Sequence, residues 1–115
     1  MKQGSQPNLY EGMYIISASL SDEARAKALE KITEGITSKG GEIHKIHDQG
    51  RRKLAYTING RREGWYYLMY FSLQPTGITE LWNEYHFHED LIRFMTLRTS
   101  AVKDKIEFKP LVEAI

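Results

Sequence analysis

The sequence predicts an α+β fold in which a four-stranded antiparallel sheet carries two helices on one of its faces. Three observations lead to this prediction. Four segments have the aromatic and β-branched composition of strands, two segments repeat apolar residues at helical spacing, and the order is β-α-β-β-α-β. With right-handed crossovers, this order gives the ferredoxin-like layout and places the first and third strands at the centre of the sheet.

The length and composition indicate one folded domain. The chain has 115 residues, of which 41% are hydrophobic and 27% charged, as in ordinary globular domains. It contains no cysteine, which excludes disulfides, thiolate metal sites and cysteine nucleophiles. No apolar run approaches the roughly 18 residues of a membrane span, and no secretory signal is recognisable. We therefore expect a cytoplasmic protein with a flexible tail at 1–8, a domain at 9–99 and a second tail at 100–115.

The first half of the predicted domain is a strand followed by a helix. Residues 9–19 are rich in aromatic and β-branched side chains, and their apolar residues fall on both parities, as in a central strand. A helix is predicted to follow Ser21, which can serve as its N-cap, and to end near Lys39 before a glycine pair. The apolar stripe along one face of this helix is Ala28, Leu29, Ile32 and Ile36.

Two further strands are predicted to form a hairpin. Residues 42–59 are long for one strand, and Gly50 marks a bulge or bend within them. Asn59-Gly60 is a strong turn pair, and residues 65–73 then carry large apolar side chains on both parities. Because the helices cover only one face of the sheet, we expect the other face to receive a partner or, alternatively, the C-terminal tail.

The last predicted elements are a second helix and a fourth strand. Pro75 ends the preceding strand, and Thr76 can cap a helix. The apolar residues of that helix repeat at i, i+3, i+4 and i+7, as Ile78, Leu81, Trp82 and Tyr85. Residues 91–99 form the last strand, which the topology places beside the first, and the tail after it shows no firm period.

The residues that could carry chemistry do not form a recognisable catalytic or metal site. His44 and His47 lie three apart in a predicted strand, so their side chains point to opposite faces. His86 and His88 lie two apart near a helix C-terminus and also diverge, so neither pair converges on a metal. No phosphate loop, dinucleotide fingerprint or nucleophile elbow is present. We predict no enzymatic activity, metal, cofactor or small-molecule substrate.

The ferredoxin-like layout is also compatible with a further alternative function, that of a small-molecule regulator or an acylphosphatase-like enzyme. Such an enzyme needs an anion-binding loop after the first strand. Residues 17–21 lack the glycines and the arginine of such a loop, which disfavours this alternative.

The basic residues are concentrated in one stretch. The net charge is only +1, yet five basic residues and no acidic one fall between Gly50 and Arg62, which predicts a local anion-binding surface. Arginine and lysine neutralise phosphates, and aromatic rings stack on unpaired bases. The alternative is a solvent-exposed hairpin whose arginines contribute to solubility and bind no anion. The basic and aromatic residues of the stretch are Arg51, Arg52, Lys53, Tyr56, Arg61, Arg62, Trp65 and Tyr66.

Several motifs resemble one known family. In order along the chain these are Tyr10-Glu11, Gly40-Gly41-Glu42-Ile43, the run Gly-Arg-Arg-Lys-Leu-Ala-Tyr-x-Ile that begins at Gly50, Gly64-x-Tyr66, and Leu91-Ile92-Arg93. Together they resemble the bacterial small-subunit ribosomal protein six family, from about residue 9 to residue 99. One departure is Gln49, where the family often has tryptophan.

The resemblance implies a structural role. Family members bind the central domain of the small-subunit rRNA as a heterodimer with small-subunit ribosomal protein eighteen. The resemblance carries six motif positions over to this chain as candidate binding residues: Arg51, Arg52, Lys53, Tyr56, Tyr66 and Arg93. The concentration of positive charge adds Arg61 and Arg62, which are not family positions. In the tail, the resemblance implies a partner-binding segment with Ile106, Phe108, Leu111 and Val112.

Alternatives stay open for individual residues and for the function. Tyr56 and Tyr66 can be packed aromatic side chains instead of stacking platforms, and Arg93 can pair with Glu11 across neighbouring strands instead of contacting RNA. A single-strand RNA-binding module of the RNA-recognition type is the alternative function. The third predicted strand lacks the stacking motif of that module, and the low net charge favours binding with a partner.

Overall fold

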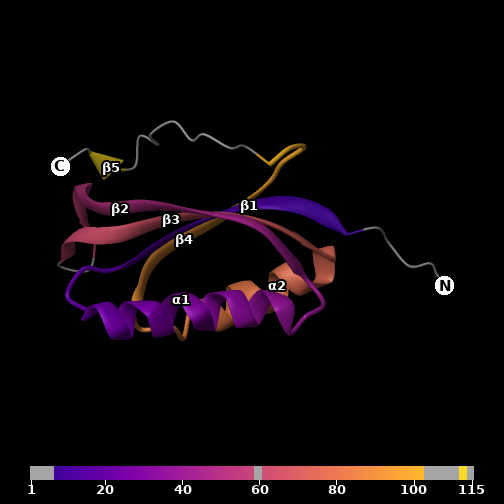
Figure 1. Ribbon diagram of the computed structural model, residues 1–115, viewed down its shortest axis with the longest axis horizontal. Helices are drawn as coiled ribbons and strands as arrows, with labels where there is room; N and C mark the ends of the chain where they lie inside the picture. Colours follow the sequence, from indigo (N-terminus) through magenta and orange to yellow (C-terminus); the bar gives the residue numbers. More distant parts are fainter. Residues whose placement is uncertain (1–6, 59–60, 103–111, 114–115) are drawn as a thin grey trace.

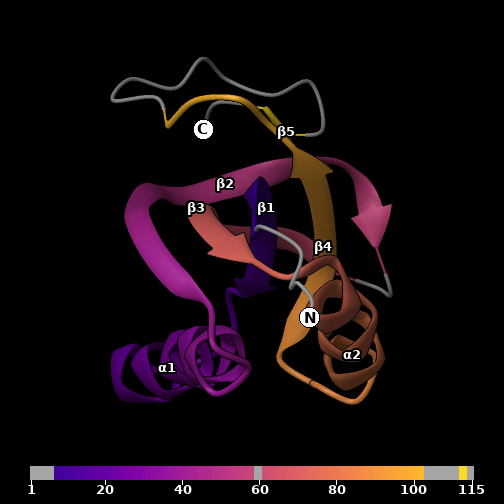
Figure 2. The ribbon, with the colours of Figure 1, turned by 90° about the vertical axis from the view of Figure 1, so that its right-hand side faces the viewer.

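The molecule has two layers, a twisted sheet and a pair of helices (Figure 1). The computed structural model describes the backbone of residues 7–58, 61–102 and 112–113, and the side chains within these ranges except those of 55–58, 61 and 112–113. Viewed along the sheet, both helices lie beneath it, and its other face is turned away from them (Figure 2). We call these the helix face and the outer face.

The observed elements confirm the predicted β-α-β-β-α-β order and the ferredoxin-like fold. Their bounds are β1 Asn8–Ser17, α1 Asp22–Thr37, β2 Glu42–Ile58, β3 Arg61–Leu73, α2 Pro75–Tyr85, β4 Leu91–Arg98 and β5 Val112–Glu113. The strand order is β4-β1-β3-β2-β5, so β1 and β3 are central as predicted. The two-residue β5 adds a strand to the expected four, because it pairs antiparallel with Lys53 and Leu54 of β2.

Helix α1 begins as the sequence predicts and ends two residues early. Ser21 is its N-cap, and the Ser21 hydroxyl accepts a hydrogen bond from the Ala24 N–H at 3.1 Å. Three residues of the predicted stripe, Ala28, Ile32 and Ile36, are buried against the sheet. The helix stops at Thr37, and Gly40 then adopts a φ of 82°, a left-handed conformation that glycine permits.

Helix α2 begins earlier than predicted. The N-cap is Gln74, with no side-chain capping bond, and Pro75 occupies the first turn, so the prediction that Thr76 caps the helix was wrong. Proline favours this position because its ring presets the helical φ and its missing N–H needs no partner there. An ion pair between Lys39, just after α1, and Glu84 of α2 joins the two helices.

The sheet buries apolar side chains on both faces. On the helix face the cluster includes Tyr14, whose hydroxyl hydrogen bonds to the hydroxyl of Tyr85 of α2 at 2.9 Å. On the outer face the buried cluster is Met13, Ile15, Leu54, Tyr66, Leu68, Tyr70 and Ile92. This confirms that the two central strands are apolar on both faces.

Two glycines shape the hairpin of β2 and β3. The register of β2 against β3 shifts between Asp48 and Gly50, and Gly50 has a φ of 81°, which confirms the predicted bulge. A Cβ atom at Gly64 would lie 2.4 Å from Ile15 Cγ2, so only glycine lets β3 approach β1 this closely. The end of β1 therefore lies directly beside the hairpin, with Ser17 opposite Gly64.

Candidate nucleic-acid interface

The register of the hairpin divides the predicted basic stretch between the two faces of the sheet. Arg51 lies opposite Trp65, which packs on the helix-face cluster, whereas Arg52 lies opposite Gly64, next to Leu54 of the outer-face cluster. Successive side chains of a strand point to opposite faces. Arg51 and Lys53 therefore share the helix side, and Arg52 lies on the outer side. The run of cations forms two separate surfaces instead of one.

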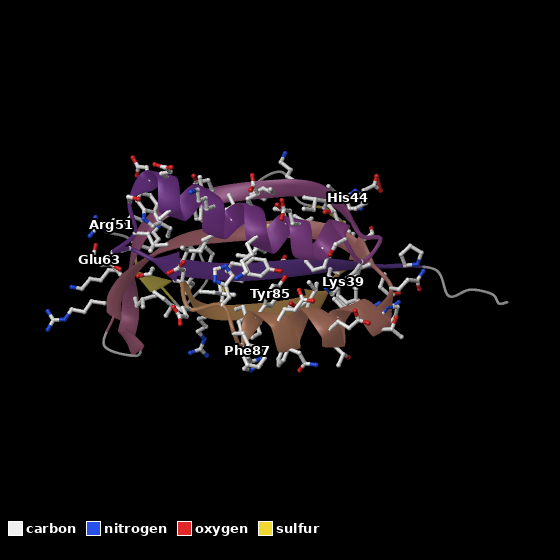
Figure 3. The ribbon with its side chains drawn as sticks, turned by 90° about the horizontal axis from the view of Figure 1, so that it is seen from below. Lys39, His44, Arg51, Glu63, Tyr85 and Phe87 are labelled. Atoms are coloured by element: carbon white, nitrogen blue, oxygen red, sulfur yellow. The ribbon has the colours of Figure 1, made fainter. Side chains whose placement is uncertain are left out.

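On the helix side, Arg51 is held by an acidic residue of the next strand. Arg51 donates two hydrogen bonds to Glu63, from Nε to Oε1 at 3.0 Å and from a terminal nitrogen to Oε2 at 3.3 Å. Both side chains lie at the same end of the molecule (Figure 3) and remain partly exposed, Arg51 by 51% and Glu63 by 38%. Glu63 also lies opposite Lys53 in the register. The hydrogen bonds to Glu63 orient the Arg51 guanidinium, and the Glu63 carboxylate lowers the net positive charge at this end of the hairpin.

These residues line a pocket of about 260 Å³. Its walls come from the turn after β1 and from the hairpin, and its lining residues are Ser17, Ala18, Ser19, Arg51, Arg62 and Glu63. The Ser17 and Ser19 hydroxyls lie 2.8 Å apart and share a hydrogen bond. Arg62 is exposed at the pocket. The sequence analysis did not predict a role for Ser17, Ser19 or Glu63, because only the register of three strands brings them to the arginines.

On the outer side, Arg52 is anchored to the bulge. Its Nε donates to the carbonyl of Gln49 at 2.8 Å, and the side chain is partly buried. Gln49 lies at the register shift between Asp48 and Gly50, so the hydrogen bond ties the Arg52 side chain to the bulge of its own strand. Arg52 is therefore oriented by its own strand, whereas Arg51 is oriented by the neighbouring strand.

Tyr66 lies in the outer-face cluster and is only 1% exposed, which fits the alternative of a packed aromatic side chain. Within the described part of the chain, its hydroxyl is buried without a hydrogen-bond partner. Burial raises the pKa of Tyr66 well above its ordinary value, and the negative charge of Glu11 raises it further. In this structure the ring contributes packing, and the hydroxyl is an unsatisfied polar group.

Arg93 lies on the outer face of β4. The register places it opposite Ile15, in one row across the sheet with Tyr66 and Gly50. Glu11 lies opposite Leu97 and accepts a hydrogen bond from the Tyr70 hydroxyl at 2.9 Å. Arg93 and Glu11 thus share a face, and their positions on the neighbouring strands differ by four residues in register.

Trp65 is occupied on the helix side. The guanidinium of Arg25, on α1, lies 3.6 Å from the centroid of the Trp65 ring. Arg25 also interacts with Asp22 of the first helical turn at 3.7 Å. This cation–π contact covers one face of the Trp65 ring.

Several predicted site residues lie outside what the structure describes. The backbones of Tyr56 and Arg61 belong to β2 and β3, but their side chains lie outside the described part. The same holds for Val112 in β5. Ile106, Phe108 and Leu111 lie entirely outside the described residues.

Two of the four histidines, His86 and His88, belong to the helix layer. His86 is the C-cap of α2, and His88 is buried with its Nε2 atom 3.4 Å from the Ala28 carbonyl. Within residues 7–58, 61–102 and 112–113, no three His, Cys, Asp or Glu side chains come together as a metal site. No described helix is long and apolar enough to span a membrane.

Comparison with known proteins assigns the chain to a family. A family model described as Ribosomal protein S6 matches residues 9–98. Small ribosomal subunit protein bS6 of Chlamydia pneumoniae is 66% identical over 105 residues, covering 91% of this chain and 94% of that protein. The protein of the same name from Protochlamydia amoebophila is 65% identical over 106 residues, covering 92% and 93%. The crystal structure of 30S ribosomal protein S6 from Thermotoga maritima matches with a TM-score of 0.77 and 33% identity, covering 82% of this chain and 89% of that one. The chain therefore belongs to the ribosomal protein S6 family.

Proposed function

We propose that this chain binds the central domain of the small-subunit rRNA together with small-subunit ribosomal protein eighteen. As a member of the S6 family it is a structural, non-enzymatic ribosomal protein of the cytoplasm. The observation that carries the proposal is the family match over residues 9–98, which contains the whole basic segment from Gly50 to Arg62. The relatives in Chlamydia pneumoniae and Protochlamydia amoebophila are named as small ribosomal subunit proteins.

The charge distribution supports an interaction that depends on a partner. The net charge of +1 is low for a protein that binds RNA alone. The exposed cations Arg51, Lys53 and Arg62 gather at the hairpin end of the sheet. Contacts from such residues to phosphates supply affinity and fix orientation, but they do not read sequence. Together with the low net charge, this supports the proposal that a second protein supplies part of the affinity.

The outer face supports a protein contact. Met95 and Leu97 of β4 point to this face and are exposed by 38% and 52%. Arg93 lies on the same strand and face, and Arg52 lies across the sheet. Exposed apolar side chains beside cations are typical of the rim of a protein interface. The tail segment with Ile106, Phe108, Leu111 and Val112 belongs to the same proposal as a partner-binding segment.

A triple variant tests the role of the basic segment. The variant combines three substitutions that each remove a cation, Arg51→Ala, Arg52→Ala and Lys53→Ala. We expect it to assemble more weakly with the rRNA and the partner. The slope of log affinity against log salt concentration should become shallower by about two to three. Affinity is measured by filter binding from low to high salt. The matched control removes three exposed cations elsewhere, Lys27→Ala, Lys31→Ala and Arg98→Ala. Unchanged assembly of the first variant at every salt concentration would contradict the proposal.

A further inference from the structure

We infer that the pocket between the β1–α1 turn and the hairpin of β2 and β3 binds one backbone phosphodiester of RNA. This inference rests on the proposed function and deepens it, because it names the chemical group bound and the residues that bind it. The lining of the pocket combines two serines, Ser17 and Ser19, with two arginines, Arg51 and Arg62. Neither serine belongs to the basic segment.

The hydroxyls leave one hydrogen-bond donor for a ligand. Ser17 Oγ and Ser19 Oγ are 2.8 Å apart, so one hydroxyl donates to the other. Whichever of them donates, the proton of the accepting hydroxyl is left for a third group. Ser17 is 1% exposed and Ser19 is exposed, so the pair runs from the protein interior to the pocket mouth. A phosphate oxygen is an acceptor of the kind that this proton needs.

The charge of the pocket selects a monoanion. Among the lining residues, Arg51 and Arg62 contribute two positive charges and Glu63 contributes one negative charge, which leaves a net charge of +1 for the lining; Lys53, opposite Glu63 in the register, lies outside it. A phosphodiester carries one negative charge and balances this pocket. A phosphate monoester approaches two negative charges at neutral pH and would be repelled by the Glu63 carboxylate. The pocket therefore matches an internal linkage of a nucleic acid better than free phosphate.

The geometry is set before any ligand arrives. Glu63 holds the Arg51 guanidinium by two hydrogen bonds, which reduces the conformational freedom that binding has to remove. Gly64, opposite Ser17, lets the hairpin approach the end of β1. The volume of about 260 Å³ is several times the roughly 30 Å³ that one water molecule takes, so sugar atoms on either side of a phosphate can also enter.

The arrangement differs from a catalytic anion loop. The turn at Ser17–Ser19 has no glycine and no arginine of its own, and both cations come from the hairpin. The described lining residues also contain no candidate nucleophile with an adjacent base. The structure therefore assigns binding to this pocket, without a reaction.

The first experiment measures assembly of the full chain with ribosomal protein eighteen and an rRNA central-domain fragment. We expect Arg62→Gln to weaken binding about tenfold and to reduce the salt slope by about one. Ser19→Ala should weaken binding several-fold without changing the slope, because it removes a neutral donor. The control is Arg98→Gln, an exposed cation on β4, which should change affinity less than twofold. Equal effects of Arg62→Gln and Arg98→Gln would overturn the inference.

A neutral-linkage scan identifies the phosphate itself. Single methylphosphonate linkages are placed along the RNA fragment, each of which removes one charge. For the unmodified protein we expect one linkage whose neutralisation weakens binding about as much as Arg62→Gln does, and this sensitivity should vanish in the Arg62→Gln variant. If Arg62→Gln weakens binding by the same factor whichever linkage is neutralised, the pocket does not hold a particular phosphate.

A second measurement separates failure of the pocket from failure of the proposed function. The full chain alone is titrated with dimethyl phosphate and with inorganic phosphate, and amide chemical shifts are recorded by NMR. Shifts at Ser17–Ser19 and Gly64 that are larger for the diester, and lost in Arg62→Gln, support the pocket even if rRNA assembly fails. Absence of shifts, or a stronger response to inorganic phosphate, overturns it even if rRNA assembly succeeds.

Discussion

The two faces of the central sheet are both buried, but they satisfy their polar groups differently. On the helix face the Tyr14 hydroxyl hydrogen bonds to Tyr85 of α2. On the outer face the Tyr66 hydroxyl is buried with no partner among the residues that the structure describes, and Met95 and Leu97 of β4 are exposed. The comparison indicates that the helix face is completed within the chain, whereas the outer face carries features of a surface that joins another molecule.

Alkaline pH is expected to have the largest effect, and it acts through buried tyrosines of both faces, Tyr14 and Tyr85 on the helix face and Tyr66 on the outer face. Burial raises the pKa of Tyr85 to about 12, and it also raises that of Tyr14. The unfolded chain loses these protons near pH 10, whereas the folded chain keeps them. The contribution of these tyrosines to stability is therefore fully present below about pH 10 and is lost as pH rises from 10 to 12. Tyr85 alone accounts for about 2 kcal/mol of this loss.

The measurement is chemical denaturation at a series of pH values from 8 to 12. The control is Tyr85→Phe, which has no proton to lose and should show a shallower fall in stability across this range. A fall of equal steepness in both proteins would contradict the assignment to Tyr85.

A pair of hydroxyl deletions compares the two faces directly at neutral pH. Tyr85→Phe leaves the buried Tyr14 hydroxyl without its partner, and we expect a loss of about 1–3 kcal/mol in the free energy of unfolding. Tyr66→Phe removes a hydroxyl that has no partner, so stability should change by less than about 0.5 kcal/mol or rise. Urea denaturation measures both. Equal destabilisation by the two variants would show that the faces do not differ in this way.

Much of the fold follows from local patterns in the sequence. The apolar residues on both parities of β1 and β3 predicted central strands, and the Ser21 cap and the Gly50 bulge were correct. The start of α2 was wrong because Thr76 and Pro75 both give start signals, and proline at the first turn prevailed. The short β5 could not be predicted, because a two-residue pairing has no periodicity.

The candidate site was less predictable than the fold. The residue types of the basic segment are visible in the sequence, but their division depends on strand parity and register. Arg51 contacts Glu63 and lines the pocket beside Ser17–Ser19, whereas Arg52 lies on the outer face. The contact between Arg51 and Glu63 joins residues twelve apart, and only the hairpin register brings them together. An acidic residue just after the two arginines at 61 and 62 was the one available signal.

The most direct test of the central claim is binding of an rRNA central-domain fragment by the full chain, with and without ribosomal protein eighteen, at two salt concentrations. We predict binding only when the partner is present, and weaker binding at the higher salt concentration because phosphate contacts release counterions. Tight binding by the chain alone would contradict the partnered function and favour a single-strand RNA-binding module. Absence of binding under both conditions would contradict the proposed role in rRNA recognition altogether.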